Sequence, residues 1–217
     1  MMRKGRLLPA GTDVELRLVH IHDVPQGALL PRCWKECERA ARFRFARHRH
    51  RFLAGRGMLR HMLADWSGLA PDGLRFGETG NGKPILLDRP DLHFNLSYSD
   101  DHILIGVTRR SPLGVDIERR RPFPQALALA EDCFDAEERT ALCQARPGMS
   151  ESDLFLSGWT RKEACLKACG IGLSQDPAEI PTGLDHGART VNIGAFVHAR
   201  VETLIQNDNV VSWAKMV

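Results

Sequence analysis

The stretch that most constrains the fold is Gly114-Val115-Asp116-Ile117-Glu118, in which apolar and acidic residues alternate. A period of two is typical of a β-strand, because successive side chains on a strand point to opposite faces. Val115 and Ile117 can therefore face a core, while Asp116 and Glu118 point together to the other side. The stretch closes a run of short predicted strands, so the middle of the chain belongs to a sheet.

The order of predicted elements indicates an α+β fold in two halves. The first half has a strand, two helices and then short strands, expected at 14–21, 33–47, 48–66, 74–76, 85–87, 92–98 and 103–108. A further strand, expected at 114–118, marks the start of the second half. The second has two helices and then strands, expected at 136–144, 151–169, 190–193, 195–204 and 210–216. We expect an N-terminal half at residues 1–111 and a C-terminal half at 112–217.

Charge is unevenly distributed along the chain. The net charge of the 217 residues is only +3, but residues 32–60 carry nine arginines and one lysine against two glutamates. Such a stretch favours an anionic partner: a phosphate-bearing ligand, an acidic protein or a nucleic acid. The alternative is a solvated basic helix face.

The cysteines and the start of the chain indicate a cytoplasmic protein. Two cysteine pairs have the four-residue spacing of helix neighbours, which differs from that of a zinc or redox motif, so we expect reduced and mostly buried thiols. The six are Cys33, Cys37, Cys133, Cys143, Cys165 and Cys169. The N-terminus has too few apolar residues for a signal peptide, and no apolar run is long enough to span a membrane.

Asp116 and Glu118 are candidate metal ligands. Two neighbouring carboxylates raise each other's pKa unless a cation lies between them, and oxygen ligands suit Mg²⁺. The alternative is two solvated acids on an exposed strand. On the predicted helix at 151–169, Glu163 and Lys167 share a face with Trp159, and Lys162 lies beside them. These side chains either form simple ion pairs along the helix, or Glu163 is a third carboxylate around the metal and the two lysines bind phosphate oxygens.

Four motifs occur in a fixed order: Asn81-Gly82-Lys83-Pro84, Phe94-Asn95-Leu96-Ser97-Tyr98-Ser99, Leu113-Gly114-Val115-Asp116-Ile117-Glu118, and Phe155-x3-Trp159-Thr160-x-Lys162-Glu163-Ala164-x2-Lys167. Together they resemble the 4′-phosphopantetheinyl transferase superfamily, in its larger, monomeric, Sfp-like type. The resemblance extends from about residue 42 to residue 173.

The resemblance implies a pseudo-twofold pair of similar α/β halves with the active site in the cleft between them. It implies a Mg²⁺-dependent enzyme, a holo-acyl-carrier-protein synthase, with coenzyme A as co-substrate. The phosphopantetheine arm would pass to a serine of an apo acyl, peptidyl or aryl carrier protein, and adenosine 3′,5′-bisphosphate would leave.

Site residues follow from the motif positions. By resemblance, Asp116, Glu118 and Glu163 are the Mg²⁺ ligands, and Glu163 is also the candidate base. Lys167 meets the diphosphate, and Lys162 matches the same motif as a coenzyme A contact.

The nucleotide pocket is expected from the first half of the chain. By resemblance, Lys83, Pro84 and Ser97 contribute to the adenine and 3′-phosphate pocket, and Arg51 meets the 3′-phosphate. Tyr98 stands where the family usually has histidine, and a tyrosine cannot become cationic. Either recognition of the 3′-phosphate is weaker here, or Tyr98 is a packed residue and an arginine of the basic stretch supplies the charge.

Two rival functions differ in class. The first is a nucleic-acid-binding protein that uses residues 32–60, although the stacking aromatics expected of one are missing. The second is a family member that has lost activity and only binds carrier proteins. The preferred reading expects coenzyme A and a carrier protein as partners, a monomer, and no nucleic acid or membrane.

Overall fold

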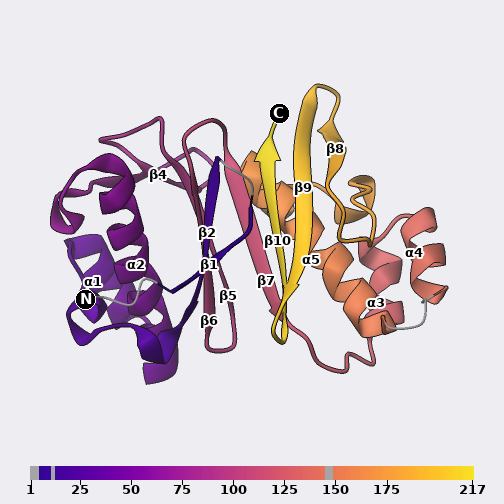
Figure 1. Ribbon diagram of the computed structural model, residues 1–217, viewed down its shortest axis with the longest axis horizontal. Helices are drawn as coiled ribbons and strands as arrows, with labels where there is room; N and C mark the ends of the chain where they lie inside the picture. Colours follow the sequence, from indigo (N-terminus) through magenta and orange to yellow (C-terminus); the bar gives the residue numbers. More distant parts are fainter. Residues whose placement is uncertain (1–4, 11–12, 145–148) are drawn as a thin grey trace. The chain divides into compact units, whose positions relative to one another are not determined.

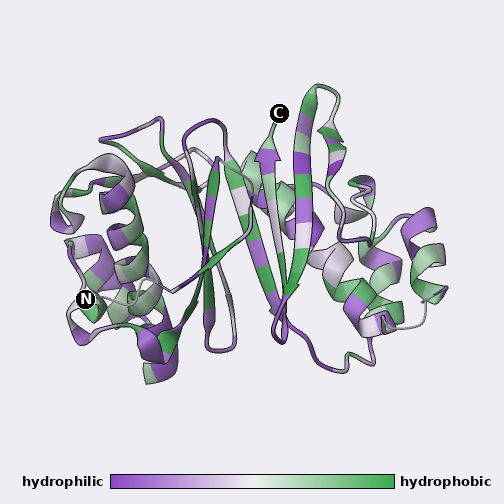
Figure 2. Ribbon diagram, viewed as in Figure 1, coloured by the Kyte–Doolittle hydropathy of each residue, from purple (hydrophilic) through white to green (hydrophobic). Residues whose placement is uncertain are grey.

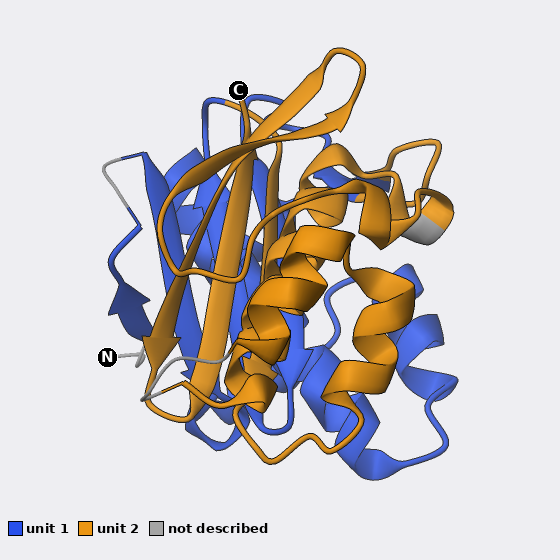
Figure 3. Ribbon diagram, turned by 90° about the vertical axis from the view of Figure 1, so that its right-hand side faces the viewer, with its two compact units in different colours: residues 1–77, 84–110 blue, residues 78–83, 111–217 orange. Residues whose placement is uncertain are grey.

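The computed structural model describes residues 5–10, 13–144 and 149–217. The chain divides into two compact units, which Figure 3 shows in different colours. Unit 1 comprises residues 1–77 and 84–110, and unit 2 comprises residues 78–83 and 111–217. The main boundary between the units lies between residues 110 and 111. The short segment 78–83, however, groups with the second unit.

Unit 1 combines a four-stranded antiparallel sheet with two helices (Figure 1). The sheet has the order β1-β2-β6-β5. Its elements are β1 (Arg6–Leu8), β2 (Val14–His20), α1 (Trp34–Ala41), α2 (Ala46–Ser67), β5 (His93–Ser99) and β6 (His102–Thr108). A hairpin of β3 (Phe76–Glu78) and β4 (Pro84–Leu86) precedes β5. One core forms where α2 residues such as Met58 and Leu59 pack with Phe94 and Ile105 of the sheet.

Unit 2 has its own four-stranded antiparallel sheet, in the order β7-β10-β9-β8, and three helices. Its elements are β7 (Leu113–Arg119), α3 (Ala126–Cys133), α4 (Ala136–Cys143), α5 (Glu151–Cys169), β8 (Arg189–Gly194), β9 (Val197–Gln206) and β10 (Asn209–Met216). Hydrophilic and hydrophobic residues alternate along β9 (Figure 2), because one face of this strand packs in the core. The mixed α+β class is therefore confirmed.

Local signals set several element ends. Helix α2 ends at Gly68, whose φ of 74° is the left-handed conformation that glycine adopts readily. Asp135 and Glu138 form the expected capping box at the start of α4. The bounds expected for α5 agree with the structure.

Three expectations were wrong. The basic helix expected at 33–47 ends at Ala41, and the chain turns back so that Phe43 packs on Phe52 of α2 with their ring centroids 5.5 Å apart. Helix α3 was not expected, because its eight residues carry no capping signal. The cysteines are free thiols, but only Cys165 is buried.

No helix among the described residues is long and apolar enough to cross a membrane.

A buried ion pair anchors α1 to α2. Glu36 is 3 % exposed and accepts hydrogen bonds from Arg60 Nε at 3.1 Å, from Arg56 Nε at 3.2 Å and from the Arg32 backbone amide at 2.8 Å. Burial acts to raise the pKa of Glu36, but these three arginines hold it below its ordinary value. Part of the basic stretch therefore neutralises an internal acid and is not free to bind a partner.

The Glu36→Gln substitution is expected to lower the free energy of unfolding by about 3 kcal/mol, because it leaves buried Arg60 without its carboxylate. Urea unfolding at pH 7 measures this loss. Since the folded-state pKa of Glu36 is depressed, the wild-type advantage is present above the ordinary carboxyl pKa and is lost as the pH falls through the folded value. Glu38→Gln removes an exposed pair with Arg42 on the same helix and should cost less than about 1 kcal/mol. Equal losses in both variants would contradict the assignment.

Candidate functional site

The site in unit 2 is built on close contact between strand β7 and helix α5. A Cβ atom placed on Gly114 would lie 2.0 Å from the Ala164 carbonyl oxygen and 2.4 Å from the Ala168 amide nitrogen. The strand backbone therefore touches the helix backbone, which only glycine permits at this position. Asp116 and Glu118 lie on the same strand face as Gly114 and are directed to the helix side of the sheet.

Three charged side chains meet at this contact. Lys167 Nζ lies 2.5 Å from Asp116 Oδ1 and 3.9 Å from Glu163 Oε2. Lys167 is one helical turn beyond Glu163, so both face β7. Asp116 is 4 % exposed, which is inconsistent with the alternative of a solvated strand acid. Two carboxylates from distant parts of the sequence thus flank a single cationic group.

Burial and the neighbouring charges of the cluster both affect the pKa of Glu163. Burial raises the pKa of Glu163, the charge of Lys167 opposes that rise, and the charge of Asp116 adds to it. On the neighbouring strand, Asp116 is paired with Ser212 of β10, whose hydroxyl lies 2.8 Å from those of Thr160 and Thr203. A network of hydrogen-bonded hydroxyl groups therefore begins at the residue paired with Asp116.

The donor set is suitable for a hard cation. Asp116 and Glu163 present only oxygen ligands and both lie beside the ammonium of Lys167. Carboxylate oxygens are the protein ligands that suit Mg²⁺. Glu118 lies two residues along the same strand face as Asp116. Within the described parts of the chain, no three His, Cys, Asp or Glu side chains are already gathered as a metal cluster. The three expected ligands are therefore on the helix side of one sheet, and Asp116 and Glu163 contact the same ammonium.

The expected role of Lys162 does not fit its position. Its side chain is fully buried, and its ammonium contacts Glu138 Oε2 at 2.7 Å and the carbonyl oxygens of Ile180 and Pro177 at 2.7 and 2.9 Å. These contacts use the three donors of the ammonium inside the protein. Lys162 therefore links α5 to α4 and to the chain after α5. The expectation that Lys162 contacts a phosphate of coenzyme A is corrected.

Lys83 lies at the end of the turn that groups with unit 2. Its ammonium donates to the Ala168 carbonyl at 2.7 Å and to the Leu113 carbonyl at 3.1 Å. Burial lowers the pKa of Lys83 to about 8, and the neighbouring Cys169 acts in the opposite direction. The side chain therefore makes internal contacts that its motif alone did not indicate.

Tyr98 and Arg51 come together in unit 1. The guanidinium carbon of Arg51 lies 5.4 Å from the centre of the Tyr98 ring. Gly55 of α2 leaves space for the phenol, since a Cβ atom there would lie 2.0 Å from Tyr98 Oη. Burial raises the pKa of Tyr98 to about 12, so it remains a neutral donor, although Arg56, Arg51 and Arg39 act to lower it. This environment favours the alternative in which Tyr98 is packed and arginines supply the charge.

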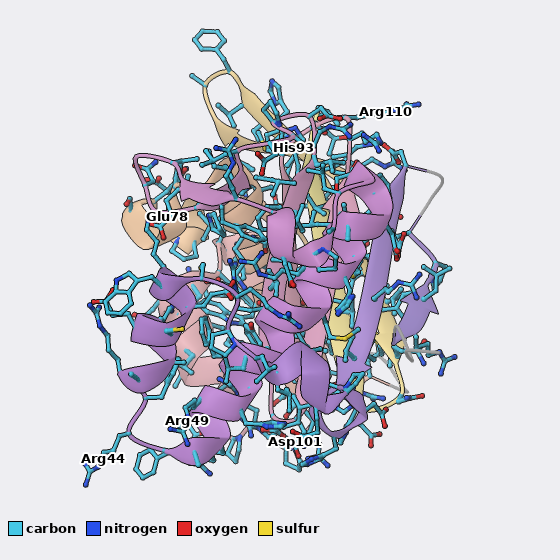
Figure 4. The ribbon with its side chains drawn as sticks, turned by 90° about the vertical axis from the view of Figure 1, so that its left-hand side faces the viewer. Arg44, Arg49, Glu78, His93, Asp101 and Arg110 are labelled. Carbon is cyan, nitrogen blue, oxygen red and sulfur yellow. The ribbon has the colours of Figure 1, made fainter. Side chains whose placement is uncertain are left out.

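The remaining expected nucleotide contacts occupy other positions in unit 1. Ser97 is buried on β5, and strand alternation places it on the opposite face from Tyr98. Pro84 begins β4. Two arginines of the basic stretch, Arg44 and Arg49, are exposed to solvent (Figure 4).

Sequence reasoning missed the structural role of Gly114. A glycine inside a strand pattern signals close approach of another backbone, so the signal was present in the sequence. The pairing of Lys162 with Glu138 had no such signal, because it joins residues on two helices whose packing the sequence does not specify.

Comparison with protein families gives two matches that together cover most of the chain. Residues 112–212 match the model described as the 4′-phosphopantetheinyl transferase superfamily. Residues 28–109 match the model described as 4′-phosphopantetheinyl transferase, N-terminal.

Individual relatives are also named as phosphopantetheinyl transferases. The 4′-phosphopantetheinyl transferase HetI of Nostoc sp. is 40 % identical over 143 residues, which are 64 % of this chain and 60 % of the relative. The 4′-phosphopantetheinyl transferase psf-1 of Bacillus pumilus is 37 % identical over 62 % of this chain and 56 % of its own length. The L-aminoadipate-semialdehyde dehydrogenase-phosphopantetheinyl transferase of Rattus norvegicus is 27 % identical over 83 % of this chain and 60 % of its own. The chain thus spans less than two thirds of the length of these curated relatives.

Proposed function

Because the chain belongs to the 4′-phosphopantetheinyl transferase superfamily, we propose that it transfers the 4′-phosphopantetheine arm of coenzyme A to a serine of an apo carrier protein. The observation that carries the proposal is the cluster of Asp116, Lys167 and Glu163, which lies within the matched superfamily region. The remaining product would be adenosine 3′,5′-bisphosphate.

The reaction forms one phosphorus–oxygen bond and breaks another. The carrier serine oxygen bonds to the phosphorus that bears the pantetheine arm, and the bond from that phosphorus to the bridging oxygen breaks. The serine proton must leave during attack, and we assign Glu163 as the base. Its raised pKa brings it nearer to neutral pH, where a base is most effective. Lys167 would offset negative charge on the departing phosphate.

Asp116, Glu118 and Glu163 would hold the magnesium ion, since their oxygens form the donor set described above. When bound, the ion supplies charge neutralisation at the diphosphate. In the described structure the ammonium of Lys167 offsets the negative charge of the Asp116 and Glu163 carboxylates.

Unit 1 would supply the nucleotide contacts. Arg51 would meet the 3′-phosphate beside the packed ring of Tyr98, with Pro84 and Ser97 near the adenine. The support is the juxtaposition of Arg51 with Tyr98 and the further positive charge of Arg39 near the phenol.

The Arg51→Gln substitution is expected to weaken coenzyme A binding about 10-fold, because it removes a charged contact to the 3′-phosphate. Binding of dephospho-coenzyme A, which lacks that phosphate, should change little. Calorimetric titration of both ligands measures the difference. Arg49→Gln, an exposed arginine two residues away, is the matched control. Equal weakening for both ligands would show that Arg51 acts elsewhere.

A transfer assay tests the proposed function directly. Labelled coenzyme A, Mg²⁺ and an apo carrier protein should give labelled carrier, and EDTA should abolish the labelling. Carrier binding without transfer would favour the inactive family member. Salt-sensitive binding to an RNA or DNA oligomer without affinity for coenzyme A would favour the nucleic-acid-binding protein.

We also propose a cytoplasmic monomer. Six free thiols suit a reducing compartment. The expected monomeric state follows from the Sfp-like type that the motifs resemble. Size-exclusion chromatography with light scattering measures that state.

A further inference from the structure

The turn at 79–83 places the Lys83 side chain against β7 and α5 of unit 2. Thr79 N bonds to the Lys83 carbonyl at 2.8 Å, and Lys83 N bonds to Thr79 Oγ1 at 3.1 Å. Gly82 takes a φ of 77°, which allows the tight turn. The stem of Lys83 then packs at the left-handed Gly170, where a Cβ atom would lie 3.1 Å from Lys83 Cδ.

The two acceptors of the Lys83 ammonium lie on opposite sides of the β7–α5 contact. Leu113 begins β7 and directly precedes Gly114, and Ala168 follows Lys167 in the last turn of α5. Carbonyls in the last turn of a helix have no partner within the helix, and a cation there is favourable. Lys83 thus caps α5 and bonds the adjoining strand with the same ammonium.

We propose that Lys83 is a positioning residue that clamps β7 against α5 and so fixes Asp116 relative to Lys167 and Glu163. The catalytic consequence rests on the proposed function. This role differs from a contact with the nucleotide. At least two of the three ammonium donors are committed to backbone carbonyls, which leaves little capacity to bind a phosphate.

The test uses Lys83→Met, which keeps most of the stem and removes the donors. We expect the dissociation constant for Mn²⁺, a spectroscopic substitute for Mg²⁺, to rise about 10-fold, as for other groups that orient metal ligands. We expect kcat to fall at least 10-fold, while the dissociation constant for coenzyme A in EDTA changes less than threefold. Hydrogen exchange at residues 114–116 and 166–170 should become faster. Lys83→Arg, which retains donors, should restore the metal affinity in part.

Lys35→Met, on an exposed part of α1, is the matched control and should change none of these values. Weaker coenzyme A binding with unchanged Mn²⁺ affinity and hydrogen exchange would overturn the proposal and assign Lys83 to the nucleotide. Unchanged exchange at both segments would overturn it as well. If Lys83→Met does not fold, Lys83→Gln takes its place in the same measurements. If the wild type neither binds Mn²⁺ nor transfers the arm, the proposed function fails, and hydrogen exchange still decides whether Lys83 clamps the two elements.

Discussion

Replacing Glu163 by glutamine is expected to lower the transfer rate at least about 100-fold without unfolding the protein. The substitution keeps the shape of the side chain but removes its charge, its basicity and one of the carboxylates beside Lys167. Steady-state transfer to an apo carrier protein, at saturating coenzyme A and Mg²⁺, measures the loss.

The same substitution should not reduce stability. Because burial raises the folded-state pKa of Glu163, keeping this carboxylate charged at neutral pH opposes folding. The glutamine variant should therefore be at least as stable as the wild type at pH 7, and its relative stability should increase as the pH rises above the ordinary carboxyl pKa. Urea unfolding at pH 5 and pH 8 provides the comparison.

Glu151→Gln is the matched control, since Glu151 is exposed at the start of the same helix. It should retain transfer activity. Near-normal turnover of Glu163→Gln would reject both the base and the ligand roles. Loss of activity together with loss of helical signal would mean that the variant reports folding and not chemistry.

Replacing Gly114 by alanine is expected to disable the site by a different route. The added methyl group would lie 2.0 Å from a backbone oxygen of α5 and 2.4 Å from a backbone nitrogen, and neither atom can rotate away. Strand β7 must then move from the helix, which separates Asp116 from Lys167. Overpacking of this kind costs about 3 kcal/mol. We expect this loss in urea unfolding, together with a transfer rate lowered at least about 10-fold.

Gly194→Ala tests whether any added methyl group in this sheet would do the same. At Gly194, in β8, a Cβ atom would lie 4.0 Å from its nearest neighbour, an ordinary contact distance. This control should keep both stability and activity. A Gly114→Ala variant with wild-type stability and transfer would show that β7 and α5 need not touch for the site to work.

Local sequence signals accounted for much of the fold. The α5 bounds followed from an apolar pattern ended by Gly170, and the start of α4 followed from its capping box. The break between α1 and α2 could not be predicted in this way, because it depends on Phe43 packing against a residue of the next helix. Helix α3 was missed because its burial against α5 and its neighbours, not a capping signal, stabilises it.

The candidate site shows the same difference between relations that spacing predicts and contacts that packing decides. Spacing placed Glu163 and Lys167 on one helix face and Asp116 with Glu118 on one strand face, and these relations are local. Spacing could not distinguish Lys162 from Lys167, since both lie near the same helix face. Only the packing of α4 shows that Lys162 is paired with buried Glu138.

The sequence by itself determined which residues could carry the chemistry, because side-chain periodicity and motif order depend on neighbours along the chain. The tertiary structure decided which of those residues meet. Asp116 and Lys167 are 51 positions apart, and their contact requires β7 to lie against α5 at Gly114. The close approach of two backbones depends on how the whole sheet and helix pack. Motif order alone predicted Lys83 as a nucleotide contact, because it does not show this packing. The position of Lys83 instead supports the proposal that it holds β7 against α5.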